Sequence, residues 1–269
     1  VCIAPDDSAS GPRAEALVRM ASAVEQDWLP TTRRTSSVWE RDRLQARTVE
    51  RVYYRDLVLA EQSAKADTRS DAALLAQQAA RAMERVLPND PELERFRTRL
   101  AAAHRLAPQL GLPDGSVEWL ITLLSSLCRR KRAFSELKES NWLPAAKESI
   151  GKAALYTLEQ HLPERITVPS GSNVRLDYPS EGPPVLAVRI QEVLGWTTTP
   201  TLLGGRLTVR MHLLAPNGRP QQITEDLHGF WTNAYPEIRK ELRARYPRHA
   251  WPVDPLTAKP QRRPARRKR

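Results

Sequence analysis

The spacing of apolar residues changes twice along the chain, and these changes restrict the fold class. The first sixty-odd residues hold short runs rich in β-branched and aromatic side chains, such as Val52 and Tyr54, which predict strands. From Ser70 the apolar residues recur with a helical period, and from Glu164 the strand pattern returns. The chain is therefore predicted to be α+β, with a helical part between two β-containing parts.

This pattern predicts four segments. Residues 1–66 are expected to form a partial, OB-like β meander that is too short to close a core alone, with its other strands upstream. Residues 67–163 are expected to form a helical subdomain, and residues 164–256 a C-terminal domain of mixed α/β structure. Residues 257–269 are basic and proline-rich, which predicts a disordered tail.

Within these segments the turn and cap residues predict individual elements. Three meander strands are expected over Ser36–Arg41, Leu44–Val52 and Tyr53–Glu61. The expected helices begin at Ser70 as an N-cap, at Asp90-Pro91-Glu92, at Ser116 (ending near Arg130) and at Pro144 (ending near Leu162).

The C-terminal domain is expected to contain a hairpin over 165–178 and a strand over Arg206–Leu214. Residues 184–194 suit either a strand or a helix, and the prolines before them with Gly195 after them favour a helix. A last helix is expected over Tyr235–Tyr246.

Charge indicates which partners suit the chain. The net charge is +11 and the isoelectric point is near 10.1, with seven Lys or Arg in residues 259–269. Such a balance attracts polyanions such as RNA, DNA or a ribosome surface. No apolar run approaches the roughly 18 residues of a membrane span. The two cysteines, Cys2 and Cys128, are not expected to pair, which fits a reducing cytoplasm.

The sequence lacks the motifs of several kinds of active site. There is no G-x-x-x-x-G-K-[ST] loop to hold nucleotide phosphates, since Gly151-Lys152 is followed by alanine within a predicted helix. The histidines and cysteines do not fall at metal-ligand spacings. Ser170 and Ser172 with Asp226 and His228 contain the residue types of a nucleophilic triad, but a hairpin turn explains the serines better. No catalytic, cofactor-binding or metal-binding residue is therefore assigned.

Four long stretches carry a resemblance to a known family. They are VPSGSNVRLDY (168–178), PPVLAVRIQEVLG (183–195), GGRLTVRMHLLAPNGRPQQITEDLHGFW (204–231) and YPEIRKELRARYPRHAWPVDP (235–255). Together they resemble the C-terminal domain of the HrpB family of bacterial DEAH-box ATP-dependent RNA helicases. The stretches ALVRMASAVEQDWL and YYRDLVLAEQ resemble the family's preceding region, and residues 67–161 match more loosely.

The resemblance implies a context for the chain. Members of this family carry two RecA-like ATPase domains N-terminal to this region, and those domains hold ATP, magnesium and most of the RNA path. No catalytic residue can be carried over to this chain. The implied partners are RNA or single-stranded nucleic acid and the RecA-like core.

The residues expected to contact nucleic acid follow from charge and periodicity. They are the outward face of one strand (Arg206, Arg210, His212), one side of the last helix (Arg239, Lys240, Arg243) and the tail (Arg262, Arg263, Arg266, Arg267). Exposed tryptophans among Trp196, Trp231 and Trp251 would stack on bases, whereas buried ones would serve as anchors. The alternative is a non-enzymatic protein-interaction or structural module, in which the basic surface only keeps the chain soluble.

Overall fold

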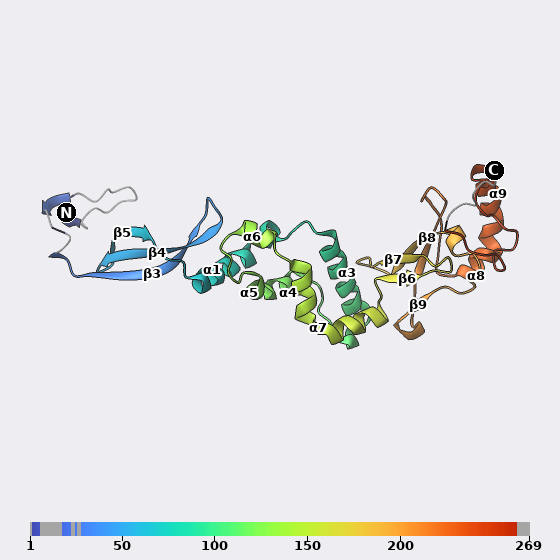
Figure 1. Cartoon of the computed structure of the whole chain (residues 1–269), viewed down its shortest axis with the longest axis horizontal. Coiled ribbons are helices and arrows are strands. Elements are labelled where there is room, and N and C mark those ends of the chain that lie inside the picture. The colour runs from blue at the N-terminus through green and yellow to red at the C-terminus, as the bar shows by residue number, and fades with distance from the viewer. Residues whose placement is uncertain (1, 6–17, 23–24, 26–27, 263–269) are drawn as a thin grey trace. The chain divides into compact units, whose positions relative to one another are not determined.

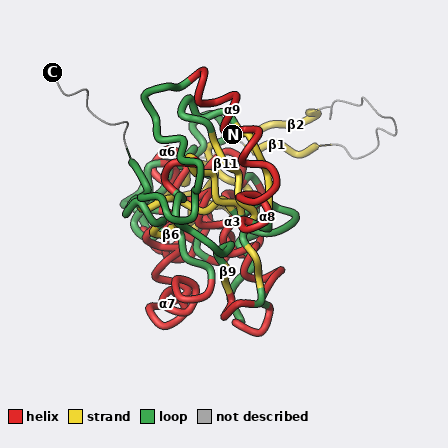
Figure 2. The backbone as a smooth tube through the Cα atoms, turned by 90° about the vertical axis from the view of Figure 1, so that its right-hand side faces the viewer, coloured by secondary structure: helices red, strands yellow, loops and turns green. Residues whose placement is uncertain are grey.

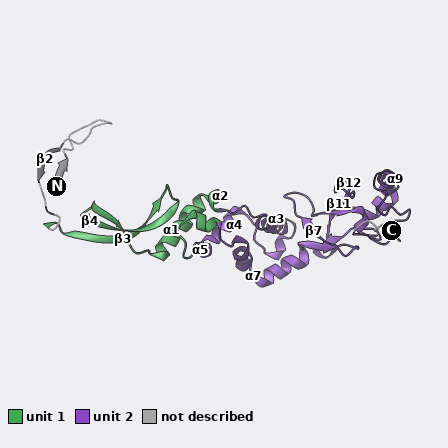
Figure 3. Ribbon diagram, turned by 45° about the horizontal axis from the view of Figure 1, so that its top comes forward, with its two compact units in different colours: residues 1–86, 128–138 green, residues 87–127, 139–269 purple. Residues whose placement is uncertain are grey.

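The computed structural model describes residues 2–5, 18–22, 25 and 28–262 (Figure 1). It divides into two compact units (Figure 3): unit 1 comprises Val1–Val86 and Cys128–Lys138, and unit 2 comprises Leu87–Leu127 and Glu139–Arg269. Each unit contains helices and strands, which confirms the α+β class. The division differs from the four predicted segments because α1 packs against the first sheet, and α2 and α6 belong to the same unit as α1, whereas the other helices belong to unit 2.

Unit 1 is built on a three-stranded antiparallel meander in the order β3-β4-β5, comprising β3 (Thr31–Glu40), β4 (Gln45–Tyr54) and β5 (Leu57–Ser63). The meander was predicted, but the expected break between Val52 and Tyr53 is wrong. The chain turns two residues later, at Arg55, which has a φ of 52°. A separate antiparallel pair joins β1 (Cys2–Pro5) to β2 (Val18–Ser22).

Helix α1 (Thr68–Arg81) is fixed to this sheet by a buried carboxylate. Asp71 is 0% exposed, and its Oδ1 accepts hydrogen bonds from Ser37 Oγ at 2.5 Å and from Thr48 Oγ1 at 3.0 Å. The N-cap is Asp67, which accepts from the backbone amides of residues 69 and 70, so the predicted cap at Ser70 is wrong. An aspartate at this position serves as well as a serine.

Residues 128–138 complete unit 1 from far along the chain. The Ala46 amide donates to the Arg132 carbonyl at 2.8 Å, and the Phe134 amide donates to the Leu44 carbonyl at 3.1 Å. The Trp39 and Phe134 rings lie 5.1 Å apart. The short helices α2 (Met83–Val86) and α6 (Phe134–Lys138) contact each other, and α6 was not predicted.

The helices of unit 2 include α3 (Pro91–Leu106) and α7 (Trp142–His161), both drawn in red in Figure 2, and these two helices contact each other. The predicted start of α3 is confirmed, since Asp90 Oδ1 accepts from the Glu92 amide at 2.9 Å. Arg99 is buried on α3, and its Nε donates to the Leu162 carbonyl at 2.6 Å. The predicted unbroken helix over 144–162 is wrong, because Gly151 adopts φ 79° and ψ 162° within α7.

A second predicted helix is also divided. The stretch expected to run from Ser116 to Arg130 forms α4 (Val117–Thr122) and α5 (Leu124–Leu127). Its start is confirmed, since Ser116 Oγ accepts from the Trp119 amide at 3.1 Å. Hydroxyls of Thr122 and Ser126 donate to backbone carbonyls three residues earlier, and such bonds compete with regular helix geometry.

A five-stranded sheet follows in the order β12-β11-β8-β7-β6, in which β8 and β11 are parallel and the other pairs antiparallel. Its strands are β6 (Arg165–Thr167), β7 (Asn173–Asp177), β8 (Val185–Arg189), β11 (Arg210–Leu214) and β12 (Pro220–Thr224). The helix favoured over 184–194 is therefore wrong. Leu186 and Val188 are buried at alternate positions of β8, and η3 (Ile190–Glu192) then ends the strand.

The last part of unit 2 is held by aromatic packing. After α8 (Leu227–Gly229) and the π-helical turn η5 (Phe230–Ala234), α9 (Tyr235–Arg245) forms as predicted. Trp231 and Trp251 are buried, and their Nε1 atoms donate to the carbonyls of Trp196 and Tyr246 at 2.8 and 2.9 Å. These two tryptophans are anchors and do not present a stacking surface.

The first residues of the predicted tail are placed in the structure. The Gly195 amide donates to the Pro255 carbonyl at 2.9 Å, and the Gln261 amide donates to the Gln191 carbonyl at 2.8 Å. Gln261 is thus attached to η3 through its backbone amide, within a segment where disorder was expected. Residues 263–269 lie outside the described residues. In the part of the chain that is described, no helix is long and apolar enough to cross a membrane.

Candidate nucleic-acid interface

The predicted basic side of the last helix lies on α9 and is only partly available to a ligand. Arg239 is half-buried, and its Nε donates to the Trp251 carbonyl at 2.9 Å, so this side chain holds the segment after the helix. Lys240 is exposed and pairs with Glu237 at 2.7 Å. Arg243 is exposed. Lys240 and Arg243 therefore face solvent, whereas Arg239 has a structural role.

The predicted outward strand face is not continuous. The expected strand over Arg206–Leu214 is divided at Val209, which is buried, into β10 (Leu207–Thr208) and β11. Strand β10 pairs with β9 (Thr201–Leu202) in a separate sheet. Arg206 precedes β10 and donates to the Leu203 carbonyl at 3.1 Å.

The other two residues of that face belong to β11. Arg210 pairs with Glu225 at 2.8 Å, and His212 is half-buried. Arg206 therefore does not share a strand face with them. In the predicted tail, Arg262 is exposed, whereas Arg263, Arg266 and Arg267 lie outside the described residues.

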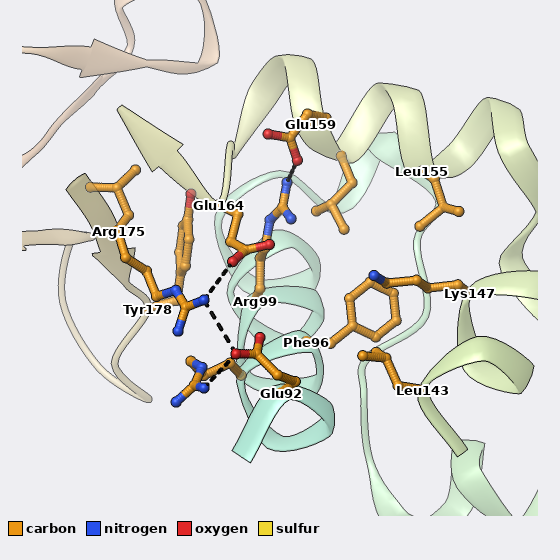
Figure 4. Close-up of a pocket in the computed structure, with 13 residues that line it drawn as sticks. Glu92, Phe96, Arg99, Leu143, Lys147, Leu155, Glu159, Glu164, Arg175 and Tyr178 are labelled. Carbon is orange, nitrogen blue, oxygen red and sulfur yellow. Dashed lines mark hydrogen bonds and ion pairs between the residues drawn. The ribbon is translucent and has the colours of Figure 1, made fainter. Parts of the chain in front are cut away.

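Unit 2 also contains a cavity that no sequence motif indicated. It has a volume of about 270 Å³ and is lined by residues of α3, α7 and β7 (Figure 4). Arg95 and Arg175 contribute from α3 and β7, and Lys147 contributes from α7. Gly151 divides the α7 residues of the lining, since Leu143 and Lys147 precede it and Leu155, Leu158 and Glu159 follow it.

One wall of the cavity is a network of ion pairs. Glu92 Oε1 accepts from Arg95 at 2.7 Å and from Arg175 at 3.3 Å, and Arg175 also pairs with Glu164 Oε1 at 3.0 Å (Figure 4). The hydrogen bond from Arg95 holds the pKa of Glu92 below its ordinary value, and the charge of Arg175 acts in the same direction. Arg99 pairs with Glu159 at 2.5 Å. Each arginine of the lining therefore has a carboxylate partner.

The opposite wall is apolar apart from one lysine. Phe96 and Leu158 are buried and Leu143 and Leu155 are half-buried, and Figure 4 shows the Lys147 side chain lying beside the Phe96 ring. The Lys147 Nζ atom is 5.8 Å from the centre of that ring. The cavity thus combines an apolar surface with a wall of charged side chains, a mixture typical of sites for amphipathic ligands.

A second hollow of about 350 Å³ adjoins the first. Arg95, Leu176 and Tyr178 line both, and His212 lines the second. The fold therefore brings one predicted residue, His212, to the same surface as Arg95, which sequence reasoning missed. The signal for Arg95 was weak, because a charged residue on an exposed helix face has many explanations.

The side chains that contain the residue types of a nucleophilic triad have structural partners. Ser170 Oγ donates to Glu192 Oε2 at 3.0 Å and Asp226 Oδ1 accepts from the Gly229 amide at 2.9 Å, so these side chains serve a turn and a helix cap. No three metal-binding side chains gather among the residues that are described.

Comparison with known proteins identifies the family. The model of the HrpB_C family, described as ATP-dependent helicase C-terminal, matches residues 119–255. The chain belongs to this family. The match covers the cavity residues on α7 and β7 and all of α9, whereas α3 precedes it.

Sequence and structure relatives agree with this assignment. The chain is 37% identical over 176 residues to the ATP-dependent RNA helicase HrpB of Escherichia coli strain K12, which covers 64% of this chain and 22% of that protein. A crystal structure of the E. coli DExH-box NTPase HrpB superposes with a TM-score of 0.70 at 30% identity, covering 92% of this chain and 32% of that one.

A second crystal structure, of the E. coli DEAH/RHA helicase HrpB, gives a TM-score of 0.61 at 29% identity and covers 88% of this chain and 30% of that one. The HrpB_C chain therefore spans about a fifth of the curated relative's length and about a third of the two solved chains.

Proposed function

We propose that this HrpB_C chain is the accessory region of a DEAH-box ATP-dependent RNA helicase that works in the cytoplasm, and that it contacts nucleic acid while a RecA-like core hydrolyses ATP. The described residues do not fit a nucleotide-phosphate cradle. Gly151-Lys152, the nearest approximation in sequence, lies within α7 and not between a strand and a helix. We therefore assign ATP and magnesium to the core.

The distribution of charge supports nucleic-acid contact. Residues 235–269 contain twelve Lys or Arg and three Asp or Glu, a net charge of +9 out of +11 for the whole chain. The excess positive charge thus lies in α9 and the residues after it, where Lys240, Arg243 and Arg262 are exposed. Such a cluster neutralises phosphates and releases counterions, so binding is largely independent of sequence and falls steeply with salt.

The test is binding of the 269-residue chain to single-stranded RNA by fluorescence anisotropy across a salt series. We expect the double variant Lys240→Ala, Arg243→Ala to bind more weakly and to lower the salt slope by about 1.4, or roughly 0.7 for each phosphate contact. The matched control, Arg81→Ala with Arg85→Ala, removes two exposed arginines from unit 1 and should bind as the original chain does.

A truncated chain provides a second test of the tail. A chain ending at Arg262 removes five cations and keeps the hydrogen bond between Gln261 and Gln191. Weaker RNA binding by this chain supports the proposal. If the complete chain does not bind RNA even at low salt, nucleic-acid contact is refuted.

One observation favours the alternative, in which the region braces the helicase core or docks another protein. Three consecutive apolar residues of the edge strand β5, Leu57, Val58 and Leu59, are 65%, 50% and 40% exposed. Apolar side chains exposed along an edge strand are typical of a surface that another chain covers. RNA affinity that is unchanged in both the α9 double variant and the truncated chain would leave this function as the better explanation.

A further inference from the structure

The cavity between α3, α7 and β7 carries one positive charge that has no carboxylate partner. The lining contains four cations (Arg95, Arg99, Lys147, Arg175) and three glutamates (Glu92, Glu159, Glu164), and the three arginines take part in the ion pairs. Within residues 28–262, Lys147 has no carboxylate at ion-pair distance, and its ammonium lies over the Phe96 ring. A ligand with a single negative charge, such as a phosphodiester, balances this excess.

The apolar wall suits a small planar group. Phe96 is 6% exposed, and Leu143 and Leu155 lie on the same side of the cavity as Phe96, away from Arg175 and Glu164 (Figure 4). The volume of about 270 Å³ is near the lower end of ligand sites, about 300 Å³, and so admits a fragment and not a large molecule. A nucleobase fits within this volume, and guanidinium planes such as those of Arg95 and Arg175 are among its usual stacking partners in proteins.

The charged wall offers hydrogen-bond acceptors to such a group. Glu92 and Glu164 pair with the arginines through Oε1, and among the described residues Oε2 of each has no partner. A carboxylate only accepts hydrogen bonds. The exocyclic amino groups of cytosine and adenine donate hydrogen bonds, whereas uracil presents a carbonyl at the corresponding position.

From these contacts we propose that the cavity binds one unpaired nucleotide with an amino-bearing base. The base lies against Leu143 and Leu155, its amino group donates to Glu92 or Glu164, and its phosphate lies at Lys147. This inference rests on the proposed nucleic-acid contact and adds a defined site to it. Because Arg95 lines both hollows, the strand continues past Arg95 toward His212.

The experiment compares oligocytidylate and oligouridylate of equal length in anisotropy titrations with the 269-residue chain. We expect tighter binding of oligocytidylate, by roughly tenfold. Lys147→Ala should weaken this binding roughly tenfold and lower the salt slope by about 0.7. The matched control is Lys152→Ala, an exposed lysine of the same helix that does not line the cavity, and it should change neither quantity.

Two further variants test the base contact separately from the charge. Glu164→Gln replaces the free acceptor with an amide, and the preference for oligocytidylate should fall. Leu155→Trp places a larger side chain in the cavity and should abolish the preference while α9 continues to bind both strands. Circular dichroism and thermal unfolding show whether each variant folds, and Leu155→Trp alone is a sufficient test because it acts on either carboxylate contact.

The outcomes separate this inference from the proposed function. If the chain binds neither strand, the proposed nucleic-acid contact fails and the inference falls with it. If it binds both strands and Lys147→Ala behaves like Lys152→Ala, the cavity is not the site although nucleic-acid contact stands. Binding of oligoglutamate that depends on Lys147, without binding of oligocytidylate, indicates an acidic peptide and also overturns the inference.

One more titration identifies the source of the nucleotide. If cytidine monophosphate competes with oligocytidylate for the cavity, the proposed nucleotide site is supported. Comparing the affinity of the mononucleotide with that of the strand shows whether the ligand is a free nucleotide or part of RNA. If Leu155→Trp leaves the competition unchanged, the nucleotide binds elsewhere and the inference is wrong.

Discussion

Replacing Asp71 by alanine should destabilise unit 1 selectively. The carboxylate is 0% exposed and accepts hydrogen bonds from Ser37 and Thr48, which lie on β3 and β4. A hydrogen bond to a charged group contributes about 1.5–3 kcal/mol. Two such bonds, with the buried Thr48 hydroxyl left without an acceptor for its proton, give an expected loss of about 4 kcal/mol in the free energy of opening of unit 1.

Hydrogen exchange read by mass spectrometry measures this loss in each unit separately. A loss of about 4 kcal/mol corresponds to roughly thousandfold faster exchange of β4 amides, since about 1.4 kcal/mol is a factor of ten. Peptides from α3 in unit 2 should keep their protection. Asp71→Asn keeps the shape and one acceptor oxygen, so about half the loss is expected.

The control variant is Asp56→Ala, which removes an exposed aspartate from the turn between β4 and β5. It should leave exchange within a few-fold of the original chain, because an exposed turn residue away from such contacts contributes little, within about 0.5 kcal/mol. If Asp71→Ala gives β4 exchange no faster than this control, the carboxylate does not hold α1 on the sheet.

The remaining predictions concern pH, backbone strain and the exposed strand. Burial raises the pKa values of the Cys128 thiol and the Tyr235 hydroxyl to about 12. The unfolded chain ionises first, near pH 8.5 and 10, so the free energy of unfolding should fall as pH rises toward 12. Urea denaturation from neutral to alkaline pH measures the fall, and Tyr235→Phe should reduce it. Gly151→Ala should lower the free energy of unfolding by about 2 kcal/mol, because its φ of 79° and ψ of 162° suit only glycine. Gly111→Ala, at φ 63° and ψ 25°, should cost about 1 kcal/mol, and equal shifts in melting temperature would contradict this reasoning. Val58→Lys, on the exposed edge strand β5, should slow aggregation measured by light scattering, and an unchanged rate would show that this edge does not associate.

The elements that the sequence predicted well are those with strong local signals. The Asp90 cap followed by proline predicted the start of α3, and the apolar stripe of Tyr235 and Leu242 predicted α9. The error over 184–194 came from giving weight to the flanking prolines and glycine. Leu186, Val188 and Ile190 are all buried, and this alternation was a usable strand signal.

The candidate site depended on information that no short segment contains. Arg95, Lys147 and Arg175 are far apart in sequence and meet only because α7 and β7 pack beside α3. A glycine within a helical pattern is a recognised warning of a break, yet Gly151 alone does not indicate a cavity. The alternating strand pattern placed His212 outward, but the neighbour that makes His212 relevant to the cavity lies on another element.

Unit 1 cannot be completed during translation until residues 128–138 have been made, because this segment is part of the unit. The Leu44 carbonyl bonds to the amide of Phe134, which is ninety residues further along the chain. At roughly 5–20 residues per second, a ribosome adds that partner roughly 5–18 s after Leu44. Trp39 leaves the exit tunnel long before Phe134 is made, so the nascent meander waits with this ring uncovered and is available to chaperones during that interval.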